Sequence, residues 1–213
     1  DGHELFVQKT AGLGIGISDE EYVQAGATMV DTIEDAFAAG EMIIKVKEPQ
    51  ASEIALLKPH HILYTYLHLA ADKPQTEGLM KSGCTAIAYE TIQYPDGSLP
   101  LLVPMSEVAG RMATQVGTTF LQKDKGGKGV LLGGVPGVKR AKVTVIGCGI
   151  AGTNATKMAM GLGADVTCID LSTKRLAELD DLFDNRITTL FSNIENIETS
   201  VLASDLVIGA VLI

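Results

Sequence analysis

Residues 143–152 read VTVIGCGIAG, and this stretch decides the fold of the second half of the chain. Its three glycines, Gly147, Gly149 and Gly152, have the spacing G-x-G-x-x-G and lie between an apolar run and a helical pattern. In that context the first glycine allows a tight turn, the second lets the backbone approach a pyrophosphate, and the third lets the helix pack closely on the strand. The stretch therefore predicts a βαβ unit that binds a dinucleotide.

Two further features complete the predicted dinucleotide site. The free N–H groups of Ile150 and Ala151 open the helix and are expected to point toward the phosphates, assisted by the helix dipole. Asp170 closes the next predicted strand, at about the 20-residue distance that the motif requires. Its carboxylate suits the adenosine ribose hydroxyls and repels a 2′-phosphate, which favours NAD over NADP. The structural alternative is a plain glycine turn with Asp170 as a helix cap.

Four residues downstream are weaker candidates for the same site. Arg175 lies one turn into the next helix, where it either flanks the adenine ribose or is a solvated helix charge. Ser192 follows the third strand, where its hydroxyl either reaches the adenosine end or caps a helix. Val211 and Leu212 follow the fourth strand, where backbone groups line a cofactor crevice, although composition alone favours a core role for both.

Short apolar runs alternate with longer amphipathic ones along the whole chain, which is the α/β pattern. The predicted strands cover residues 42–47, 62–67, 85–91, 143–146, 165–170, 187–190 and 206–210, and the predicted helices cover 76–82, 106–123, 150–162, 173–182 and 194–202. Ser106 is the expected N-cap of the longest helix. We expect two Rossmann-like domains: an N-terminal substrate domain over 1–123 and a doubly wound NAD-binding domain over 142–213, joined by a glycine-rich connection over 124–141.

Composition restricts the class of protein. The 213 residues are 46% hydrophobic and 20% charged, which excludes a disordered chain. The formal net charge of −9 argues against nucleic acid or an anionic membrane as the main partner, and no apolar run has the ~20 residues of a membrane span.

The cysteines and the chain ends carry two further expectations. The cysteines are Cys84, Cys148 and Cys168, an odd number without a C-x-x-C pair, which favours reduced thiols in a cytoplasmic protein over disulfides or a metal site. The sequence starts at Asp1 without a methionine and stops inside the apolar run 206–213. We expect it to be an internal piece of a longer enzyme.

Two polar residues in the first half follow predicted strands, where α/β sheets carry their chemistry. Lys47 could hold a carboxylate or polarise a carbonyl, and His68 could shuttle a proton. A snorkelling surface lysine and a hydrogen-bonded core histidine are the structural alternatives. Glu90 could be a site carboxylate, a solvated strand end or a structural hydrogen-bond partner. His60 and His61 precede their strand and are expected at the surface.

Five runs of residues resemble the L-alanine dehydrogenases. They are Lys45-Val46-Lys47-Glu48-Pro49, Tyr66-Leu67-His68-Leu69-Ala70-Ala71, Ala88-Tyr89-Glu90-Thr91, Pro104-Met105-Ser106-Glu107-Val108-Ala109-Gly110-Arg111 and Gly133-Gly134-Val135-Pro136-Gly137. The resemblance covers essentially the whole chain. It implies that Lys47 binds substrate, that His68 is the acid/base group and that Ser106 contacts the cofactor. It also puts the glycine loop, Asp170, Arg175, Ser192 and the pair Val211 and Leu212 at cofactor positions.

The same resemblance implies an activity and an assembly. The activity is the reversible oxidative deamination of L-alanine by NAD to pyruvate and ammonium, and the assembly is a homo-oligomer, typically a hexamer. The proton-translocating transhydrogenases share parts of these runs, but the contexts of Lys47 and His68 favour the dehydrogenase. An NAD(H)-binding transhydrogenase subunit and a non-catalytic NAD-binding module are the alternatives. An N-terminal arginine and a second catalytic aspartate of the family fall outside this chain.

Overall fold

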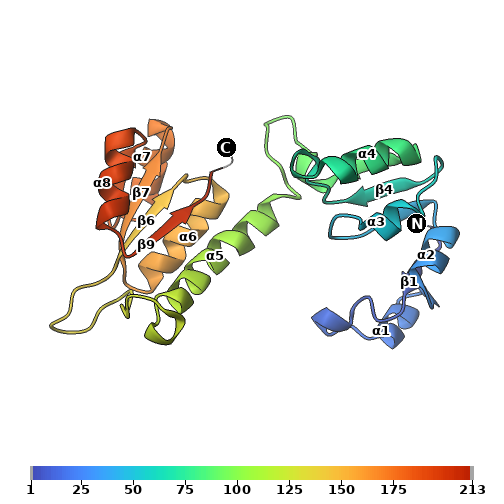
Figure 1. Ribbon diagram of the computed structural model, residues 1–213, viewed down its shortest axis with the longest axis horizontal. Helices are drawn as coiled ribbons and strands as arrows, with labels where there is room; N and C mark the ends of the chain where they lie inside the picture. The colour runs from blue at the N-terminus through green and yellow to red at the C-terminus, as the bar shows by residue number, and fades with distance from the viewer. Residues whose placement is uncertain (1, 212–213) are drawn as a thin grey trace. The chain divides into compact units, whose positions relative to one another are not determined.

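The computed structural model describes residues 2–211 and forms two compact α/β units, which divide between Leu101 and Leu102 (Figure 1). This agrees with the predicted fold class. Within the described residues, no helix has both the length and the apolar character needed to cross a membrane.

The first unit contains two parallel sheets. Its elements are β1 (Phe6–Gln8), η1 (Leu13–Ile15), α1 (Asp19–Gln24), β2 (Thr28–Val30), α2 (Ile33–Ala39), β3 (Met42–Ile44), α3 (Ala51–Ile54), β4 (Ile62–Thr65), η2 (Leu69–Ala71), α4 (Lys73–Ser82), β5 (Thr85–Ala88) and η3 (Tyr89–Thr91). Strand β1 pairs with β2, and β4 lies between β3 and β5. All pairs are parallel, so the carboxyl ends of β3, β4 and β5 meet at one edge.

The core of the first unit forms around the central strand β4. Leu63 and Leu67 are almost fully buried and pack with Phe37, Ile43 and Leu79 from the flanking elements. His61, expected at the surface, is buried immediately before β4, and its Nδ1 accepts a hydrogen bond from the Lys58 N–H at 3.1 Å. The expectation was wrong because the residue before a central strand is covered by the elements that pack on that strand.

The second unit is a four-stranded parallel sheet covered by helices. Its elements are α5 (Val103–Phe120), η4 (Lys123–Lys125), β6 (Lys142–Ile146), α6 (Ile150–Gly161), β7 (Asp165–Asp170), α7 (Thr173–Leu182), β8 (Thr188–Phe191), α8 (Ile194–Ala203) and β9 (Leu206–Gly209). The strand order is β8-β7-β6-β9, so the chain reverses direction across the sheet at β6. This is the order of one half of a doubly wound dinucleotide-binding fold, with its ligand expected at the carboxyl end of β6.

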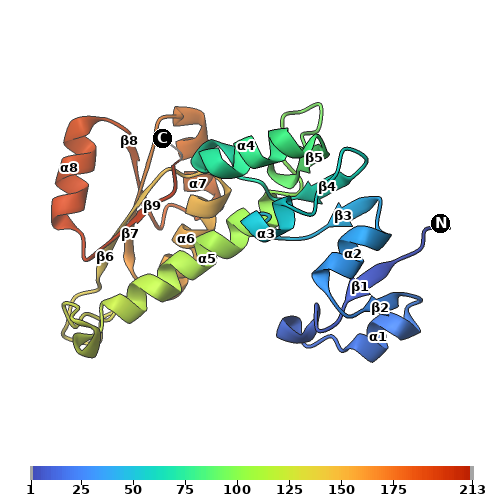
Figure 2. The same cartoon turned by 45° about the vertical axis from the view of Figure 1, so that its right-hand side comes forward.

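Helix α5 belongs to the second unit, whereas we expected the first domain to continue through it to Lys123. The reason is close packing of α5 on α6, visible in both views (Figures 1 and 2). A Cβ on Gly110 would lie 2.0 Å from the carbonyl oxygen of Ala151, so only glycine permits this approach. The buried Thr114 hydroxyl donates to the carbonyl oxygen of Ala155 at 3.0 Å.

The start of α5 also differs from the prediction. The helix begins at Val103 with Leu102 as N-cap, so Ser106 lies inside it rather than capping it. Pro104 occupies the first turn, where the missing N–H costs no helical hydrogen bond. Ser106 lies one turn before Gly110 on the same helix face, which is the face that approaches α6.

Three strands of the first unit end earlier than predicted. β3 stops at Ile44 rather than residue 47, β4 stops at Thr65 rather than residue 67, and β5 stops at Ala88, after which Tyr89–Thr91 forms a 3-10 turn. An apolar run indicates a strand but does not indicate where its ladder ends. The predicted strands of the second sheet, and the helices α6, α7 and α8 between them, each begin and end within one residue of the observed bounds.

Candidate functional site

The glycine loop after β6 has the geometry that the motif predicts. Gly147 has φ +87°, a left-handed conformation that favours glycine. A Cβ on Gly152 would lie 1.9 Å from the carbonyl oxygen of Gly147, so the start of α6 packs directly on the turn. A Cβ on Gly149, in contrast, would meet no heavy atom within 4 Å. The loop thus leaves open space at the amino end of α6, where the first N–H groups of a helix bind phosphate.

Asp170 ties the end of β7 to this loop. Its Oδ2 accepts a hydrogen bond from the Cys148 N–H at 2.7 Å, and its Oδ1 accepts one from the Ser172 N–H at 2.8 Å. The helix-cap alternative fails, because the N-cap of α7 is Ser172, whose hydroxyl accepts from the Arg175 N–H at 3.2 Å. Each carboxylate oxygen retains a second lone pair, so the group remains able to accept hydrogen bonds from ribose hydroxyls.

Arg175 braces the same loop from α7. Its Nε donates to the Cys148 carbonyl oxygen at 2.8 Å and its Nη2 to the Thr153 hydroxyl at 2.7 Å, while Nη1 lies 2.7 Å from a carboxylate oxygen of Glu178. Arg175 is therefore not a free solvated charge. It places a cation beside the glycine loop, held by the hydrogen bonds to Cys148 and Thr153.

Two of the remaining predicted cofactor residues, Ser192 and Val211, follow strands β8 and β9 of this sheet. The Ser192 N–H donates to the Asp170 carbonyl oxygen at 2.9 Å, and Asn193, not Ser192, caps α8. Val211 is 53% exposed rather than part of the core, and it adjoins the turn, since a Cβ on Gly147 would lie 2.4 Å from its Cγ1. Leu212 lies outside the described residues.

Cys148 in the loop and Cys168 on β7 are both buried. A hydrogen bond with the Cys168 thiol, followed by burial, raises the pKa of Cys148. The Cys148 thiol is therefore neutral near pH 7 and unsuited to act as a nucleophile.

The second cluster of polar side chains lies at the carboxyl edge of the β3-β4-β5 sheet. Lys47 and Glu48 follow β3, and His68 follows β4. Glu48 lies between the other two: one carboxylate oxygen contacts Nδ1 of His68, and the other lies 3.3 Å from Nζ of Lys47. The structure thus brings the two predicted catalytic candidates to the same carboxylate.

Glu90 supports His68 from the end of β5. Its carboxylate accepts the His68 N–H at 2.7 Å and the Leu67 N–H at 3.1 Å, so it is a structural hydrogen-bond partner, one of the three possibilities that the sequence left open. His68 has φ +47°, a conformation that costs a non-glycine residue about 1–3 kcal/mol. The hydrogen bonds to Glu90 hold this unfavourable conformation in place.

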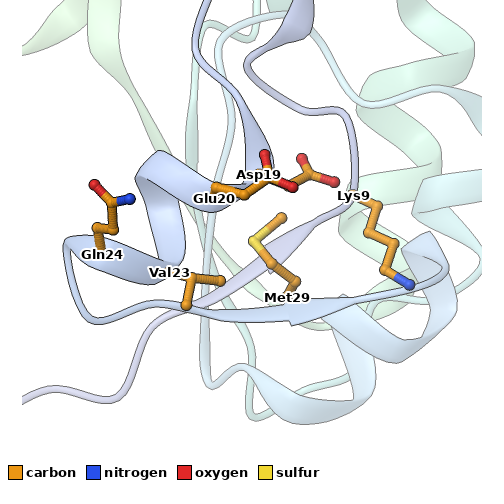
Figure 3. A pocket seen from close by; sticks show the side chains of 6 residues that line it. All are labelled: Lys9, Asp19, Glu20, Val23, Gln24 and Met29. Atoms are coloured by element: carbon orange, nitrogen blue, oxygen red, sulfur yellow. The ribbon is translucent and has the colours of Figure 1, made fainter.

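Two hollows open on the surface of the first unit. One, of about 580 Å³, lies beside the charged cluster and is lined by Glu48, Pro49, Leu67, His68, Asp72 and Gln75, among others. The other, of about 450 Å³, is lined by Lys9, Asp19, Glu20, Val23, Gln24 and Met29 (Figure 3). We assign chemistry to the first, because only there do an imidazole and a carboxylate converge on one cavity.

Glu48 was missed by the sequence reasoning. The residue belongs to the run Lys45-Val46-Lys47-Glu48-Pro49, in which only Lys47 is assigned a role. An acidic residue next to a candidate catalytic lysine is a weak signal, since a neighbour along the chain usually points elsewhere. Its contact with His68 depends on how two strand ends are placed in three dimensions.

Taken together, the sheet order and glycine loop define the second unit as a dinucleotide-binding unit, and the first unit carries a pocket with acid/base groups. The family model described as "Alanine dehydrogenase/PNT, N-terminal domain" matches residues 1–109, and "Alanine dehydrogenase/PNT, C-terminal domain" matches residues 113–213. The chain belongs to the alanine dehydrogenase/PNT family.

Individual relatives agree with this family. The alanine dehydrogenase of Methanococcus maripaludis is 56% identical over 212 residues, and that of Geobacillus stearothermophilus is 57% identical over 213. Each match takes in the whole of this chain and 57% of the relative, so the chain spans a little over half the length of these proteins.

Solved structures show the same fold. One named L-alanine dehydrogenase has a TM-score of 0.91 at 52% identity, covering all of this chain and 58% of that one. A transhydrogenase from Sinorhizobium meliloti is more distant, with a TM-score of 0.81 at 25% identity over all of this chain and 61% of that one.

Proposed function

We propose that this chain is part of an NAD-dependent L-alanine dehydrogenase, which converts L-alanine and water reversibly to pyruvate and ammonium. The observation that carries the proposal is that Lys47 and His68 both contact Glu48, with Glu48 and His68 lining one cavity, in a chain that also has a complete glycine loop. The names of its relatives supply the substrate, alanine.

The cofactor proposed for the second unit is NAD. Gly147, Gly149 and Gly152 shape the loop, and the N–H groups of Ile150 and Ala151 would bind the pyrophosphate. Asp170 would accept the ribose hydroxyls and disfavour the 2′-phosphate of NADP. The outer contacts proposed are Ser106 on α5, Arg175, Ser192, Val211 and Leu212.

NAD, when bound, supplies the acceptor for the hydride of the substrate. Lys47 is proposed to hold the substrate carboxylate or carbonyl with its ammonium, on a side chain that is 72% exposed and thus available to a ligand. His68 is proposed to give and take protons while water adds to the imine and ammonia leaves. Both proposed roles thus belong to side chains that are exposed to solvent.

The principal alternative is an NAD(H)-binding subunit of a transhydrogenase. The similarity of this chain to the transhydrogenase from S. meliloti supports that alternative. The higher identity to alanine dehydrogenases and the Lys47 and His68 cluster favour the dehydrogenase. A non-catalytic NAD-binding module is the second alternative. We further propose a cytoplasmic homo-oligomer, a hexamer on the family resemblance.

A rate assay on the full-length protein tests the proposal. NADH consumption is measured with pyruvate and ammonium together, with each alone, and with an oxidised dinucleotide analogue as acceptor. We expect turnover only when both substrates are present, at a rate on the order of 10 per second. Transfer to the analogue without pyruvate would support a transhydrogenase, and NADH binding without either reaction would support a non-catalytic module.

Lys47→Ala provides the matching test of the site. Because a hydrogen bond to a charged group contributes about 1.5–3 kcal/mol, we expect kcat/KM for pyruvate to fall about 10- to 100-fold. Lys73→Ala is the control, since Lys73 is an exposed lysine of the same unit paired with Glu77 on α4. Equal kinetics in the two variants would remove Lys47 from the site.

A further inference from the structure

The carboxylate of Glu48 joins the two groups to which the proposed function assigns chemistry. One oxygen contacts Nδ1 of His68 and the other lies 3.3 Å from Nζ of Lys47. Its side chain is 24% exposed, against 41% for His68 and 72% for Lys47. Of the three groups, Glu48 is therefore the one least open to a ligand and the one in contact with both others.

The backbone fixes this arrangement. The ladder between the strands continues past their ends, since the Tyr66 N–H donates to the Val46 carbonyl oxygen at 3.3 Å. The hydroxyl of Thr65, which is fully buried, then donates to the Lys47 carbonyl oxygen at 2.9 Å. The segment that carries Glu48 is thus held beside the segment that carries His68.

The imidazole ring of His68 is positioned on two sides. The Tyr66 ring is nearly parallel to it, at 14° with centroids 6.2 Å apart. The Glu48 carboxylate can only accept a hydrogen bond, so Nδ1 of His68 carries the hydrogen in this contact. Nε2 is then the ring nitrogen left to exchange a proton with a substrate.

We propose that Glu48 is a positioning residue, which fixes the His68 tautomer, directs Nε2 toward the cavity and holds the Lys47 ammonium beside it. This inference rests on the proposed function, since proton exchange requires a substrate. The role needs an ionised carboxylate. Hydrogen bonds from its own backbone N–H, then from His68 and Lys47, lower the pKa of Glu48, while burial has the opposite effect.

The other carboxylates around His68 bind backbone N–H groups and not the imidazole ring. Glu90, from the end of β5, binds the His68 backbone N–H, and Asp72 accepts the Gln75 N–H as N-cap of α4. Among the described residues, Glu48 is the carboxylate in contact with the imidazole ring itself.

Two variants of the full-length protein separate the charge of Glu48 from its hydrogen bond. Glu48→Gln keeps an acceptor but removes the charge, and Glu48→Ala removes both. Glu77→Gln is the matched control, because it makes the same change at a surface carboxylate on α4. By comparison with other carboxylates that orient functional histidines, we expect kcat to fall about 10- to 100-fold in Glu48→Gln and further in Glu48→Ala.

A pH profile distinguishes positioning from a purely structural role. A carboxylate stabilises the imidazolium, so its loss is expected to move the acid limb of kcat/KM for alanine toward lower pH in Glu48→Gln. A fall in rate without this movement, or a profile equal to that of Glu77→Gln, would overturn the proposal.

A chemical readout keeps the result independent of turnover. Diethyl pyrocarbonate reacts with neutral imidazole, and mass spectrometry of the His68 peptide gives the pH of half-maximal reaction. We expect that pH to fall in Glu48→Gln and to stay unchanged in Glu77→Gln. If this shift occurs in a protein that shows no alanine or pyruvate turnover, the pairing stands and the proposed function fails. If turnover is present and the shift is absent, the proposed role of Glu48 fails.

Discussion

The two candidate sites differ in how they are built. The dinucleotide site of the second unit is made mainly of backbone: a positive-φ glycine, a helix amino end and a carboxylate that binds the loop N–H. The site of the first unit is made of side chains from separate strand ends, which meet at Glu48. A contiguous backbone motif can be identified from its spacing, whereas a meeting of side chains requires the tertiary structure.

The largest effect on cofactor binding is expected from breaking the backbone site. Gly152→Ala puts a Cβ 1.9 Å from the Gly147 carbonyl oxygen, so the loop must move. Because a displacement of about 1 Å can cost 10²-fold, we expect NADH affinity to fall by about that factor or more. Gly161→Ala in the same helix is the control, since a Cβ there meets no heavy atom within 4 Å. Calorimetric titration with NADH measures both, and equal affinities would contradict the assigned loop.

A smaller effect is expected from removing the carboxylate at the end of β7. Asp170→Ser removes the like charge facing a 2′-phosphate, so the preference for NAD over NADP should fall about 10- to 100-fold. NAD binding should also weaken, because the Cys148 N–H loses its acceptor. Asp165→Ser, at the exposed start of the same strand, should keep the wild-type preference. An unchanged ratio in Asp170→Ser would remove this residue from the cofactor site.

The smallest expected effect concerns the sheet beneath the dinucleotide site. Hydrogen bonds from Lys128 and from the Lys142 N–H lower the pKa of Asp205, which precedes β9. A lowered pKa means that the stability from this carboxylate is present above about pH 3.9 and is lost as the pH falls through the lowered value. Urea unfolding between pH 5 and about pH 2 should therefore show a weaker acid dependence in Asp205→Asn than in the wild type. An identical pH dependence would show that Asp205 contributes no such linkage.

The fold was predicted well where periodicity and glycines define it. The second sheet and its helices followed from apolar runs and the G-x-G-x-x-G turn, and β7 and α7 match the predicted bounds. The place of α5 was not predicted, because its packing on α6 depends on Gly110, an ordinary helical glycine by sequence. Likewise, nothing in the order of residues separates the buried His61 from the exposed His60.

The candidate site was predicted in its members but not in its connections. Lys47 and His68 were identified by their positions after strands, and the family resemblance gave them roles. The carboxylate that joins them was not identified, nor was the support that Glu90 gives to the positive-φ backbone of His68. These contacts arise from strand register and from where each ladder stops, which the residue pattern does not specify.

The most direct test of this division between two sites is His68→Ala in the full-length protein, with NADH affinity and pyruvate turnover measured on the same sample. His60→Ala is the control, an exposed histidine of the same unit. We predict that His68→Ala binds NADH as the wild type does and loses about 10²- to 10⁴-fold in turnover, the usual cost of a missing general acid/base. Turnover equal to that of His60→Ala, or loss of NADH binding together with turnover, would contradict the assignment of chemistry to the first unit and cofactor binding to the second.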